Sequence, residues 1–504
     1  MGNMITDLLE RGTDNAPAII GSDTEPLRYG ALRTHIESVV STLNGYGLGS
    51  RDRVAIVLPN GPQMASAFVS IAAGATAAPL NPAYRADEFN FFLSDLRASA
   101  LVLMAESDSP ARNVAKAQAI PIIELEPDKD IAGLFTLRSE IVVSKKNIAP
   151  TVSDDTALIL HTSGTTSRPK IVPLSHGNVV ASARHIAETL TLSRRDCCLN
   201  IMPLFHIHGL IAAVLASLTA GGSVVCTQGF NALNFFSSMK KYQPTWYTAV
   251  PTMHQAILAR ASRNKTIIQS SQLRFIRSSS SSLPPQVMLQ LEKTFDVPVI
   301  ESYGMTEAAH QMASNPLPPQ PRKPGTVGPA AGPEVAIMDQ SDDILSAGAT
   351  GEIVIRGPNV TEGYEGNPEA NEEAFSSGWF RTGDQGVIDE DGYLTITGRL
   401  KEIINRGGEK ISPREVDEVL MDHPAVAQVV TFAIPHEKLG EEVGAAVVLS
   451  DGADVEENAL RVFVGERLAD FKVPRKIVFL DEIPKGQTGK LQRIGLAEKL
   501  GLVR

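Results

Sequence analysis

The chain has 504 residues, of which 43% are hydrophobic, enough to bury a large core and to build two or more domains. Its formal net charge of -11 argues against nucleic acid and anionic membrane surfaces as partners, because both require a basic face. Only three cysteines occur, Cys197, Cys198 and Cys226, and without metal-ligand spacing they favour buried thiols in a reducing compartment. We therefore expect a cytoplasmic protein without a signal peptide or membrane insertion, and the oligomeric state stays open.

In the first part of the chain, short apolar runs alternate with amphipathic segments. Strand-like runs occur at 54–58, 245–250 and 273–277. Residues 287–295 carry apolar side chains at helical spacing after two prolines, which predicts a helix. Two longer apolar stretches, 68–80 and 210–226, are interrupted by Gly-Ala or Gly-Gly pairs, and we expect core helices there. The alternation predicts α/β layers with parallel strands.

The string 161–170 is rich in hydroxylated residues, ends in Lys170 and lies between two predicted strands, 156–160 and 171–175. Glycine lets backbone N–H groups approach an anion, the hydroxyls add donors, and the lysine adds a cation. The Walker pattern is absent, and no helix is expected directly after the lysine. The loop predicts a polyphosphate site made by Thr162, Ser163, Gly164, Thr165, Thr166 and Lys170.

A second motif, 301–307, follows a strand-like run at 297–300. Tyr303 offers a stacking face to a base, the Thr306 hydroxyl can reach a phosphate, and the Glu307 carboxylate suits Mg²⁺. These roles fit one nucleotide. A third motif, Thr382-Gly383-Asp384, places a carboxylate after a glycine turn, where it can accept hydrogen bonds from both ribose hydroxyls.

The pattern changes towards the C-terminus. Between residues 324 and 398, short strands such as 352–357 and 392–396 alternate with Gly and Asp turns, which predicts an antiparallel sheet or barrel. After Arg399 a small α+β unit follows, with helices at 413–421 and 456–468 and a strand at 429–433. The fold class is α/β: a large N-terminal domain of layered α/β subdomains with a barrel-like β edge, plus a small α+β C-terminal domain, with the boundary at 398–401.

Six motifs, in this order, resemble the adenylate-forming superfamily of acyl-CoA synthetases, luciferases and peptide-synthetase adenylation domains over nearly the whole chain. They are 162–170, 203–209, 303–307, 382–384, 398–402 and 484–490. The resemblance implies a two-step reaction. A carboxylate attacks the α-phosphate of ATP to give an acyl-adenylate and pyrophosphate, and the thiol of coenzyme A then displaces AMP. ATP, Mg²⁺ and coenzyme A are therefore the expected cofactors and co-substrates.

The resemblance also assigns residues to roles. Lys490 matches the lysine that bridges the attacking carboxylate and the α-phosphate. Lys401 matches the hinge, 399–401, between an adenylating domain, 1–398, and a mobile domain, 402–504. Gly407 and Gly408 match the loop along the pantetheine arm of coenzyme A. The further expected nucleotide contacts are Ser281, Glu301, Ser302, Tyr303, Thr306, Asp384 and Arg399. The expected metal contacts are Thr166 and Glu307. The expected catalytic residues are Lys490, His206, Thr306 and Glu307.

The sequence differs from the usual family motifs at two places. Ile171 follows the loop lysine where glycine is usual, and residues 278–283 read Ser-Ser-Ser-Ser-Ser-Leu where fatty and aromatic acyl members usually carry Ser-Gly-Ala-Ala-Pro-Leu. Hydroxyls and imidazoles favour a small polar acid, whereas a second carboxylate would need donors or positive charge. The candidate acid contacts are His206, His208, Ser280 and His310, although each histidine taken singly also fits a core or surface role.

The amino-acid sequence of the motifs is most similar to that of the oxalyl-CoA synthetase subgroup, and this resemblance implies oxalate as the acid. A medium-chain fatty acid or 4-coumarate-type CoA ligase is the alternative within the same class. A non-catalytic nucleotide-binding relative is the alternative from a different class, and retention of the C-terminal Lys490 speaks against it. A peptide-synthetase loading module, which would use a separate carrier protein, is a further alternative.

Overall fold

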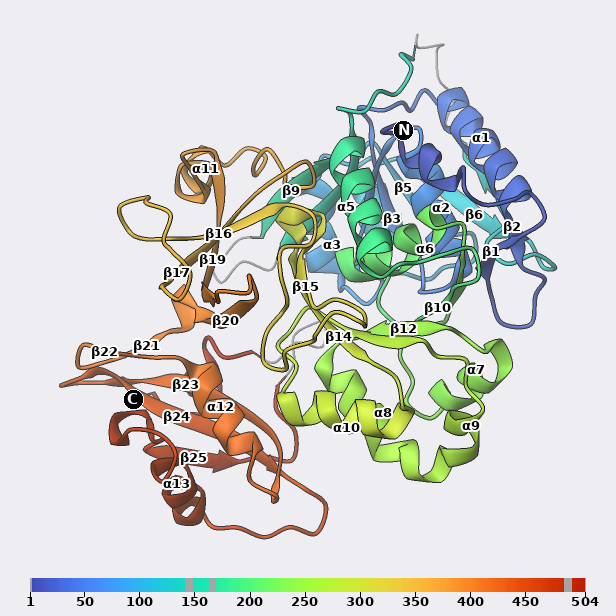
Figure 1. Cartoon of the computed structure of the whole chain (residues 1–504). Coiled ribbons are helices and arrows are strands. Elements are labelled where there is room, and N and C mark those ends of the chain that lie inside the picture. Colours follow the sequence, from blue (N-terminus) through green and yellow to red (C-terminus); the bar gives the residue numbers. More distant parts are fainter. Residues whose placement is uncertain (1, 141–147, 163–168, 485–491, 504) are drawn as a thin grey trace.

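The computed structural model describes residues 2–140, 148–162, 169–484 and 492–503. A large sheet lies near the N-terminus (Figure 1). It is parallel except at its two ends, where the outermost strand pairs antiparallel with its neighbour. Its strands, in spatial order, are β7 (Phe135–Arg138), β6 (Ile122–Pro127), β5 (Ala100–Met104), β3 (Arg53–Val57), β4 (Thr76–Pro79), β8 (Thr156–Thr162) and β9 (Lys170–Ser175). Both strands that flank the hydroxylated loop are thus confirmed.

A second large sheet lies beside the first and is also parallel in its middle. Its strands, in spatial order, are β15 (His310–Ser314), β14 (Val299–Met305), β13 (Phe275–Ser278), β12 (Trp246–Ala249), β10 (Cys197–Asn200), β11 (Ser223–Cys226), β1 (Pro17–Ile20) and β2 (Leu27–Arg28). The predicted α/β layers with parallel strands are confirmed. The three cysteines lie on β10 and β11, and burial raises the pKa of each thiol.

Helices form layers between and outside these sheets. The central core packs side chains of α1 (Tyr29–Gly45), α2 (Pro62–Ala72), α5 (His176–Thr189) and the π-helix η2 (His208–Leu215) with strands of both sheets. The outer face of the first sheet is covered by α3 (Ala86–Asp95) and α4 (Pro110–Ala117). The outer face of the second is covered by α7 (Phe235–Tyr242), α8 (Pro251–Ala261), α9 (Lys265–Gln269) and α10 (Pro285–Phe295). Helix α10 confirms the helix predicted at 287–295.

The two long apolar stretches were predicted as core helices, and that prediction is wrong for the C-terminal part of each. Helix α2 ends at Ala72 and β4 follows; likewise η2 and α6 (Ala216–Thr219) are followed by β11. A glycine turn separates helix from strand, and Gly221 there has a φ of +74°, which favours glycine. Buried parallel strands carry apolar residues on both faces, so such a strand continues the apolar run of a core helix. No helix in the described ranges is long and apolar enough to cross a membrane.

An antiparallel sheet follows, as predicted. Its strands are β16 (Glu334–Met338), β17 (Thr350–Arg356), β18 (Phe375–Ser376), β19 (Trp379–Ile388) and β20 (Leu394–Arg399), and α11 (Pro368–Ala374) precedes β18. Short 3₁₀ turns occur at η1 (Ile5–Leu9), η3 (Ser262–Asn264), η4 (Thr306–Ala308), η5 (Leu400–Glu402) and η6 (Asp470–Lys472).

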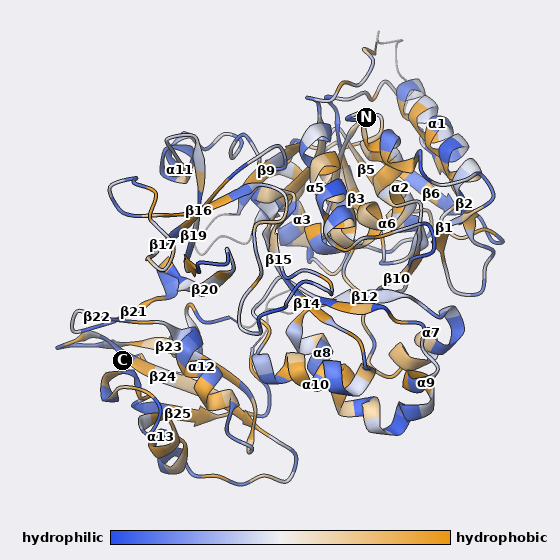
Figure 2. Cartoon of the chain, in the orientation of Figure 1, coloured by the Kyte–Doolittle hydropathy of each residue, from blue (hydrophilic) through white to orange (hydrophobic). Residues whose placement is uncertain are grey.

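The C-terminal part of the chain forms a separate small sheet with its own apolar clusters (Figure 2). Its strands are β21 (Ile404–Arg406), β22 (Glu409–Ile411), β23 (Val426–His436), β24 (Gly440–Leu449) and β25 (Lys476–Phe479). The helices are α12 (Pro413–Met421), α13 (Glu457–Gly465) and α14 (Leu496–Lys499), so the predicted α+β unit is confirmed. The turn η5, with exposed Lys401 at its centre, connects this sheet to β20.

Candidate active site

The hydroxylated loop emerges from paired strands. Thr162 at the end of β8 is directly opposite Lys170 at the start of β9. The Lys170 ammonium lies 4.3 Å from the ring centroid of Tyr364, a cation–π contact that holds the side chain beside the loop. Ser163, Gly164, Thr165 and Thr166 lie outside the described residues, as does Lys490.

Ile171 now has a structural explanation. It continues β9, is 8% exposed and packs in the cluster that covers the outer face of the first sheet. Its carbonyl also accepts a 3.1 Å hydrogen bond from the amide of Glu365. The chain after the loop lysine is therefore a regular buried strand, and such a strand has no need of glycine.

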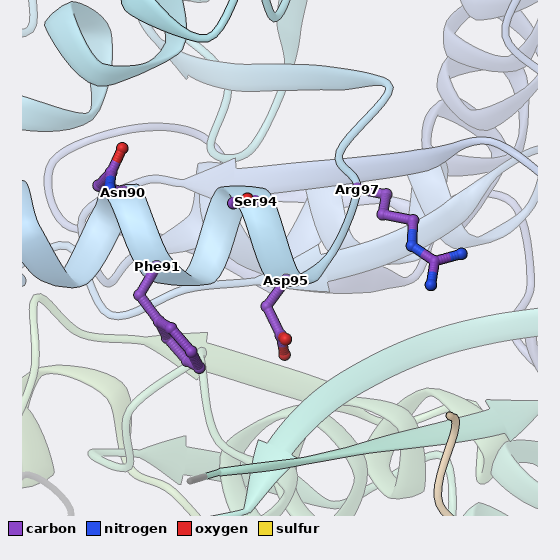
Figure 3. A pocket seen from close by; sticks show the side chains of 5 residues that line it. All are labelled: Asn90, Phe91, Ser94, Asp95 and Arg97. Carbon is purple, nitrogen blue, oxygen red and sulfur yellow. The ribbon is translucent and has the colours of Figure 1, made fainter. Parts of the chain in front are cut away.

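Upstream of the loop, β8 is tied to helix α3. His161 Nε2 lies 3.1 Å from Asp95 Oδ2, and both side chains are largely buried. Burial lowers the pKa of His161, although the Asp95 carboxylate opposes the shift. A hollow beside this contact is lined by Asn90, Phe91, Ser94, Asp95 and Arg97 of α3 and the turn after it (Figure 3). No sequence motif predicted this pair, which joins the strand before the loop to helix α3.

The predicted metal ligand, Glu307, is on η4 immediately after Thr306. Its side chain is 6% exposed, and its Oε1 accepts a 2.8 Å hydrogen bond from the hydroxyl of Tyr364. Burial raises the pKa of Glu307, whereas that hydrogen bond and the charges of Arg399 and Lys170 lower it. Tyr364 therefore links the loop lysine to the acidic residue, a connection that sequence reasoning missed because Tyr364 lies in a loop remote from both motifs.

The predicted ribose-binding pair is assembled by strand register. Asp384 on β19 is directly opposite Arg399 on β20, and Arg399 Nε donates a 2.9 Å hydrogen bond to Asp384 Oδ1. The Tyr303 hydroxyl donates to Asp384 Oδ2 at 2.5 Å. The nearby carboxylate raises the pKa of Arg399, so this cation stays charged. Three sequence-predicted residues thus meet at one carboxylate.

The candidate acid contacts gather at the start of η2. His208 is fully buried, its Nδ1 lies 2.9 Å from Ser280 Oγ, and its Nε2 lies 2.6 Å from Thr248 Oγ1. The ring centroid of buried His310 is 5.0 Å from that of His208. The half-buried His206 accepts a 3.4 Å hydrogen bond at Nδ1 from the backbone amide of His208. The side chains of His208, Ser280 and His310 therefore form one polar cluster, and His206 contacts the backbone of His208 beside it, at the start of a π-helix of a kind that occurs at functional sites.

Two more buried polar residues belong to this cluster and were missed by sequence reasoning. Arg277, on β13, has its Nη1 3.4 Å from His208 Nε2 and its Nη2 3.4 Å from Gln311 Oε1. Burial lowers the pKa of the Arg277 guanidinium to about 9, so it remains a cation at neutral pH. A fatty acyl chain would need an apolar channel, and this cluster is polar and charged.

Other predicted nucleotide contacts have structural partners within the fold. Buried Glu301 accepts a 2.8 Å hydrogen bond at Oε1 from the amide of Leu283. Burial raises the pKa of Glu301 to about 7. The Ser302 hydroxyl is 2.9 Å from that of Ser314, whereas Ser281 is exposed. The Glu301 and Ser302 side chains therefore brace β14 and the serine-rich loop.

The predicted coenzyme A loop is the turn between β21 and β22. Gly407 and Gly408 have φ angles of +60° and +99°, and the Gly407 amide donates a 2.8 Å hydrogen bond to the Leu439 carbonyl. A Cβ on Gly408 would meet no atom within 4 Å, so its backbone faces open space. The turn leaves room for the close approach of a ligand.

A carboxylate held between a tyrosine and an arginine, together with a lysine at the edge of a largely parallel sheet, is an arrangement that suits a nucleotide-binding enzyme. The chain belongs to the AMP-binding enzyme family, which matches residues 9–365, and the AMP-binding enzyme C-terminal domain matches residues 415–490.

Similar proteins agree with that assignment. The chain is 46% identical to an oxalate–CoA ligase of Arabidopsis thaliana over 93% of this chain and 92% of the relative. It is 41% identical to an oxalate–CoA ligase of Saccharomyces cerevisiae, with 96% and 95% covered. The crystal structure of ATP-bound MatB from Rhodopseudomonas palustris superposes with a TM-score of 0.89 at 29% identity, over 99% of each chain.

Proposed function

We propose that this protein is an AMP-forming acid–CoA ligase that acts on oxalate. The observation that carries the choice of acid is the polar cluster of buried His208 and His310 with half-buried Ser280, which suits a short, strongly polar acid and opposes an acyl chain. The identity of 46% and 41% to two oxalate–CoA ligases over nearly the full length supports the same acid.

The proposed reaction has two steps. An oxygen of one oxalate carboxylate attacks the α-phosphate of ATP, the bond to the β-phosphate breaks, and oxalyl-AMP and pyrophosphate form. The thiol sulfur of coenzyme A, after losing its proton, then attacks the activated carbonyl carbon, and AMP leaves with the oxygen that came from oxalate. The products are oxalyl-CoA, AMP and pyrophosphate.

The chain's residues divide this work. The loop from Thr162 to Lys170 would bind the β- and γ-phosphates, Asp384 and Arg399 the ribose, and Tyr303 the base. Lys490 would compensate the negative charge that converges as carboxylate and α-phosphate meet. His206, His208, Ser280 and His310 would contact the acid, and Thr306 the α-phosphate.

Mg²⁺ fits this donor set. Mg²⁺ is commonly held by one or two carboxylates together with substrate phosphates, so the buried Glu307 with the Thr166 hydroxyl would suffice. Bound there, the ion would neutralise phosphate charge. No group of three or more His, Cys, Asp or Glu side chains forms a separate metal site among the described residues.

We further propose that residues 402–504 rotate about 399–401 relative to 1–398 between the two steps, which would remove Lys490 and bring Gly407 and Gly408 to the pantetheine arm. Exposed Lys401, on the connecting turn, is well placed to absorb such a rotation. The expected location is the cytoplasm, which supplies ATP and coenzyme A.

A substrate panel tests the proposal. Pyrophosphate release is followed with oxalate, malonate, acetate, octanoate and coumarate, each with and without coenzyme A. We expect oxalate to give the highest kcat/KM and to yield a thioester only with coenzyme A. A preference for octanoate or coumarate would contradict oxalate and leave an acid–CoA ligase, whereas ATP binding without pyrophosphate release from any acid would favour a non-catalytic relative.

A further inference from the structure

The strand β13 buries an arginine whose charge has no acidic partner among the described residues. Arg277 is fully buried, and in the part of the chain that the structure describes its guanidinium has three neutral acceptors: His208 Nε2 at 3.4 Å, Gln311 Oε1 at 3.4 Å and Thr248 Oγ1 at 3.5 Å. Its Nε has no hydrogen-bond partner in the described part of the chain, where no carboxylate forms an ion pair with it either. Buried cations are normally paired, because an uncompensated charge in a low dielectric is costly. A fully buried arginine without an ion pair in the described residues, beside the cluster of His208, Ser280 and His310, therefore indicates that an anionic ligand binds nearby.

Donor and acceptor roles can be assigned along the hydrogen bonds that lead from Arg277 to the residues proposed to contact the substrate acid. A guanidinium only donates, so His208 Nε2 must be an acceptor. The Thr248 hydroxyl, 2.6 Å from the same nitrogen, accepts from Arg277 and donates to His208. The proton of neutral His208 is then on Nδ1 and is donated to Ser280 Oγ at 2.9 Å. The Ser280 hydroxyl hydrogen is directed onward, to a further acceptor.

The backbone supports a fixed role for Ser280. Its φ is +71°, a left-handed conformation that is costly for a residue other than glycine. Such a conformation persists where the surroundings hold the side chain in a required position. Arg277, Thr248 and His208 supply those surroundings.

We propose that Arg277 selects acids that carry a second negative charge, by ordering His208 and Ser280 as hydrogen-bond donors and by supplying the charge that the dianion compensates. The inference rests on the proposed function, because it deepens the choice of oxalate into a choice of doubly charged acids. Arg277 is thus a positioning and specificity residue. In a site shielded from water, its charge acts over several ångströms with little screening.

The test compares oxalate with oxamate, which has the same shape but carries a neutral amide in place of the second carboxylate. Pyrophosphate release is measured for the wild-type protein and for Arg277→Met, Arg277→Lys and Arg274→Met. Arg274, near the start of the same strand, pairs with Asp196 and is the matched control. We expect the wild-type protein to prefer oxalate. Arg277→Met should lower kcat/KM for oxalate by about 30-fold or more and that for oxamate by less than about threefold, because hydrogen bonds to charged groups are the stronger ones. Arg277→Lys should recover part of the preference, and Arg274→Met should keep it.

An equal loss for both acids in Arg277→Met, with an unchanged KM for ATP, would overturn the proposal and assign Arg277 to packing. If Arg277→Met does not fold, Ser280→Ala decides instead: the oxalate-to-oxamate ratio should fall about tenfold, and an unchanged ratio overturns the proposal. Failure of the proposed function is separate, because it would show in the wild-type protein as preference for a monocarboxylate such as octanoate. That result would overturn the specificity inference as well.

Discussion

The Tyr303 hydroxyl and the Asp384 carboxylate are joined by a 2.5 Å hydrogen bond that links β14 to β19. Arg399 holds the other oxygen of the same carboxylate. Each carboxylate oxygen accepts more than one hydrogen bond, so both oxygens can also receive ribose hydroxyls. The second large sheet and the antiparallel sheet therefore meet at a preorganised carboxylate, which is the proposed ribose contact.

Removal of the Asp384 charge should weaken ATP binding. Hydrogen bonds to charged groups are worth about 1.5–3 kcal/mol, so Asp384→Asn should raise KM for ATP about 10-fold or more. Tyr303→Phe keeps the ring for stacking and should cost less than about fivefold. Measured KM values in pyrophosphate exchange check both, and an unchanged value in Asp384→Asn would remove the residue from the ribose site.

The hydrogen bond from Tyr364 should set the acid side of the pH profile. Burial raises the pKa of Glu307, and the Tyr364 hydroxyl lowers it. If the active form of Glu307 is the carboxylate, adenylation falls as pH drops through this pKa. Tyr364→Phe removes the lowering contact, so the acid limb of the rate profile should move to higher pH. The Phe ring keeps the cation–π contact with Lys170.

A matched tyrosine provides the control for that shift. Tyr393 also has a lysine, Lys323, 4.3 Å from its ring centroid, and its hydroxyl donates to the Pro321 carbonyl at 2.6 Å. Tyr393→Phe should leave the acid limb in place. The same displacement in both variants, or none in Tyr364→Phe, would show that Tyr364 does not tune Glu307.

Glu301 should make the fold less stable at high pH. Its pKa, about 7 in the folded protein, lies above the ordinary 4.5, so the folded state binds the proton more tightly than the unfolded state. Its stabilising contribution is complete below pH 4.5 and is lost as pH rises through about 7. Glu301→Gln mimics the protonated acid and should raise the unfolding temperature at pH 8 more than at pH 5.5. In the free energy of unfolding, the two effects should differ by on the order of 3 kcal/mol at most.

Glu442→Gln should change the stability of the fold at pH 8 in the opposite direction to Glu301→Gln. Its hydrogen bond with Arg406 helps to lower the pKa of Glu442, so that carboxylate stabilises the fold above its unfolded pKa, and the variant should lose stability at pH 8. Calorimetric scans of both variants at both pH values check the pair. A stability loss at pH 8 in Glu301→Gln would mean that the ionised form of Glu301 is the one the fold uses.

Gly408 should matter for thioester formation and not for adenylation. Alanine at a φ of +99° is strained even in open space. Gly408→Ala should lower the rate with coenzyme A and leave oxalate-dependent pyrophosphate exchange intact. Gly452, with a φ of +75° and equally open surroundings, lies in a turn of the same C-terminal region, and Gly452→Ala is the control for strain alone. Equal effects of both variants would argue against a coenzyme A contact.

The sequence predicted those parts of the site whose residues lie close together along the chain. Asp384 directly follows Gly383, and Tyr303 closely follows the strand-like run 297–300, so both patterns are visible within a few residues. The strands around the loop and the helix α10 were predicted because their periodicity is local.

Arg277 was missed for a physical reason. In a sequence, Leu273-Arg274-Phe275-Ile276-Arg277 reads as a strand with one arginine on each face, and an arginine on a strand suggests contact with solvent. Parallel sheets have both faces covered, and residues far along the chain, His208 and Gln311, meet Arg277 only in the fold. Tyr364 likewise reaches Glu307 and Lys170 from a distant loop, so neither contact has a local signature.

The most direct test of the central claim is the fate of the oxygen in the reacting acid. The protein is incubated with ATP, Mg²⁺, coenzyme A and oxalate labelled with heavy oxygen, and the nucleotide and thioester are analysed by mass spectrometry. We predict oxalyl-CoA together with AMP that carries one heavy oxygen atom from oxalate, because the acid attacks the α-phosphate and AMP departs with that oxygen. Unlabelled AMP, or label in phosphate with ADP as the nucleotide product, would contradict an adenylate-forming oxalate–CoA ligase.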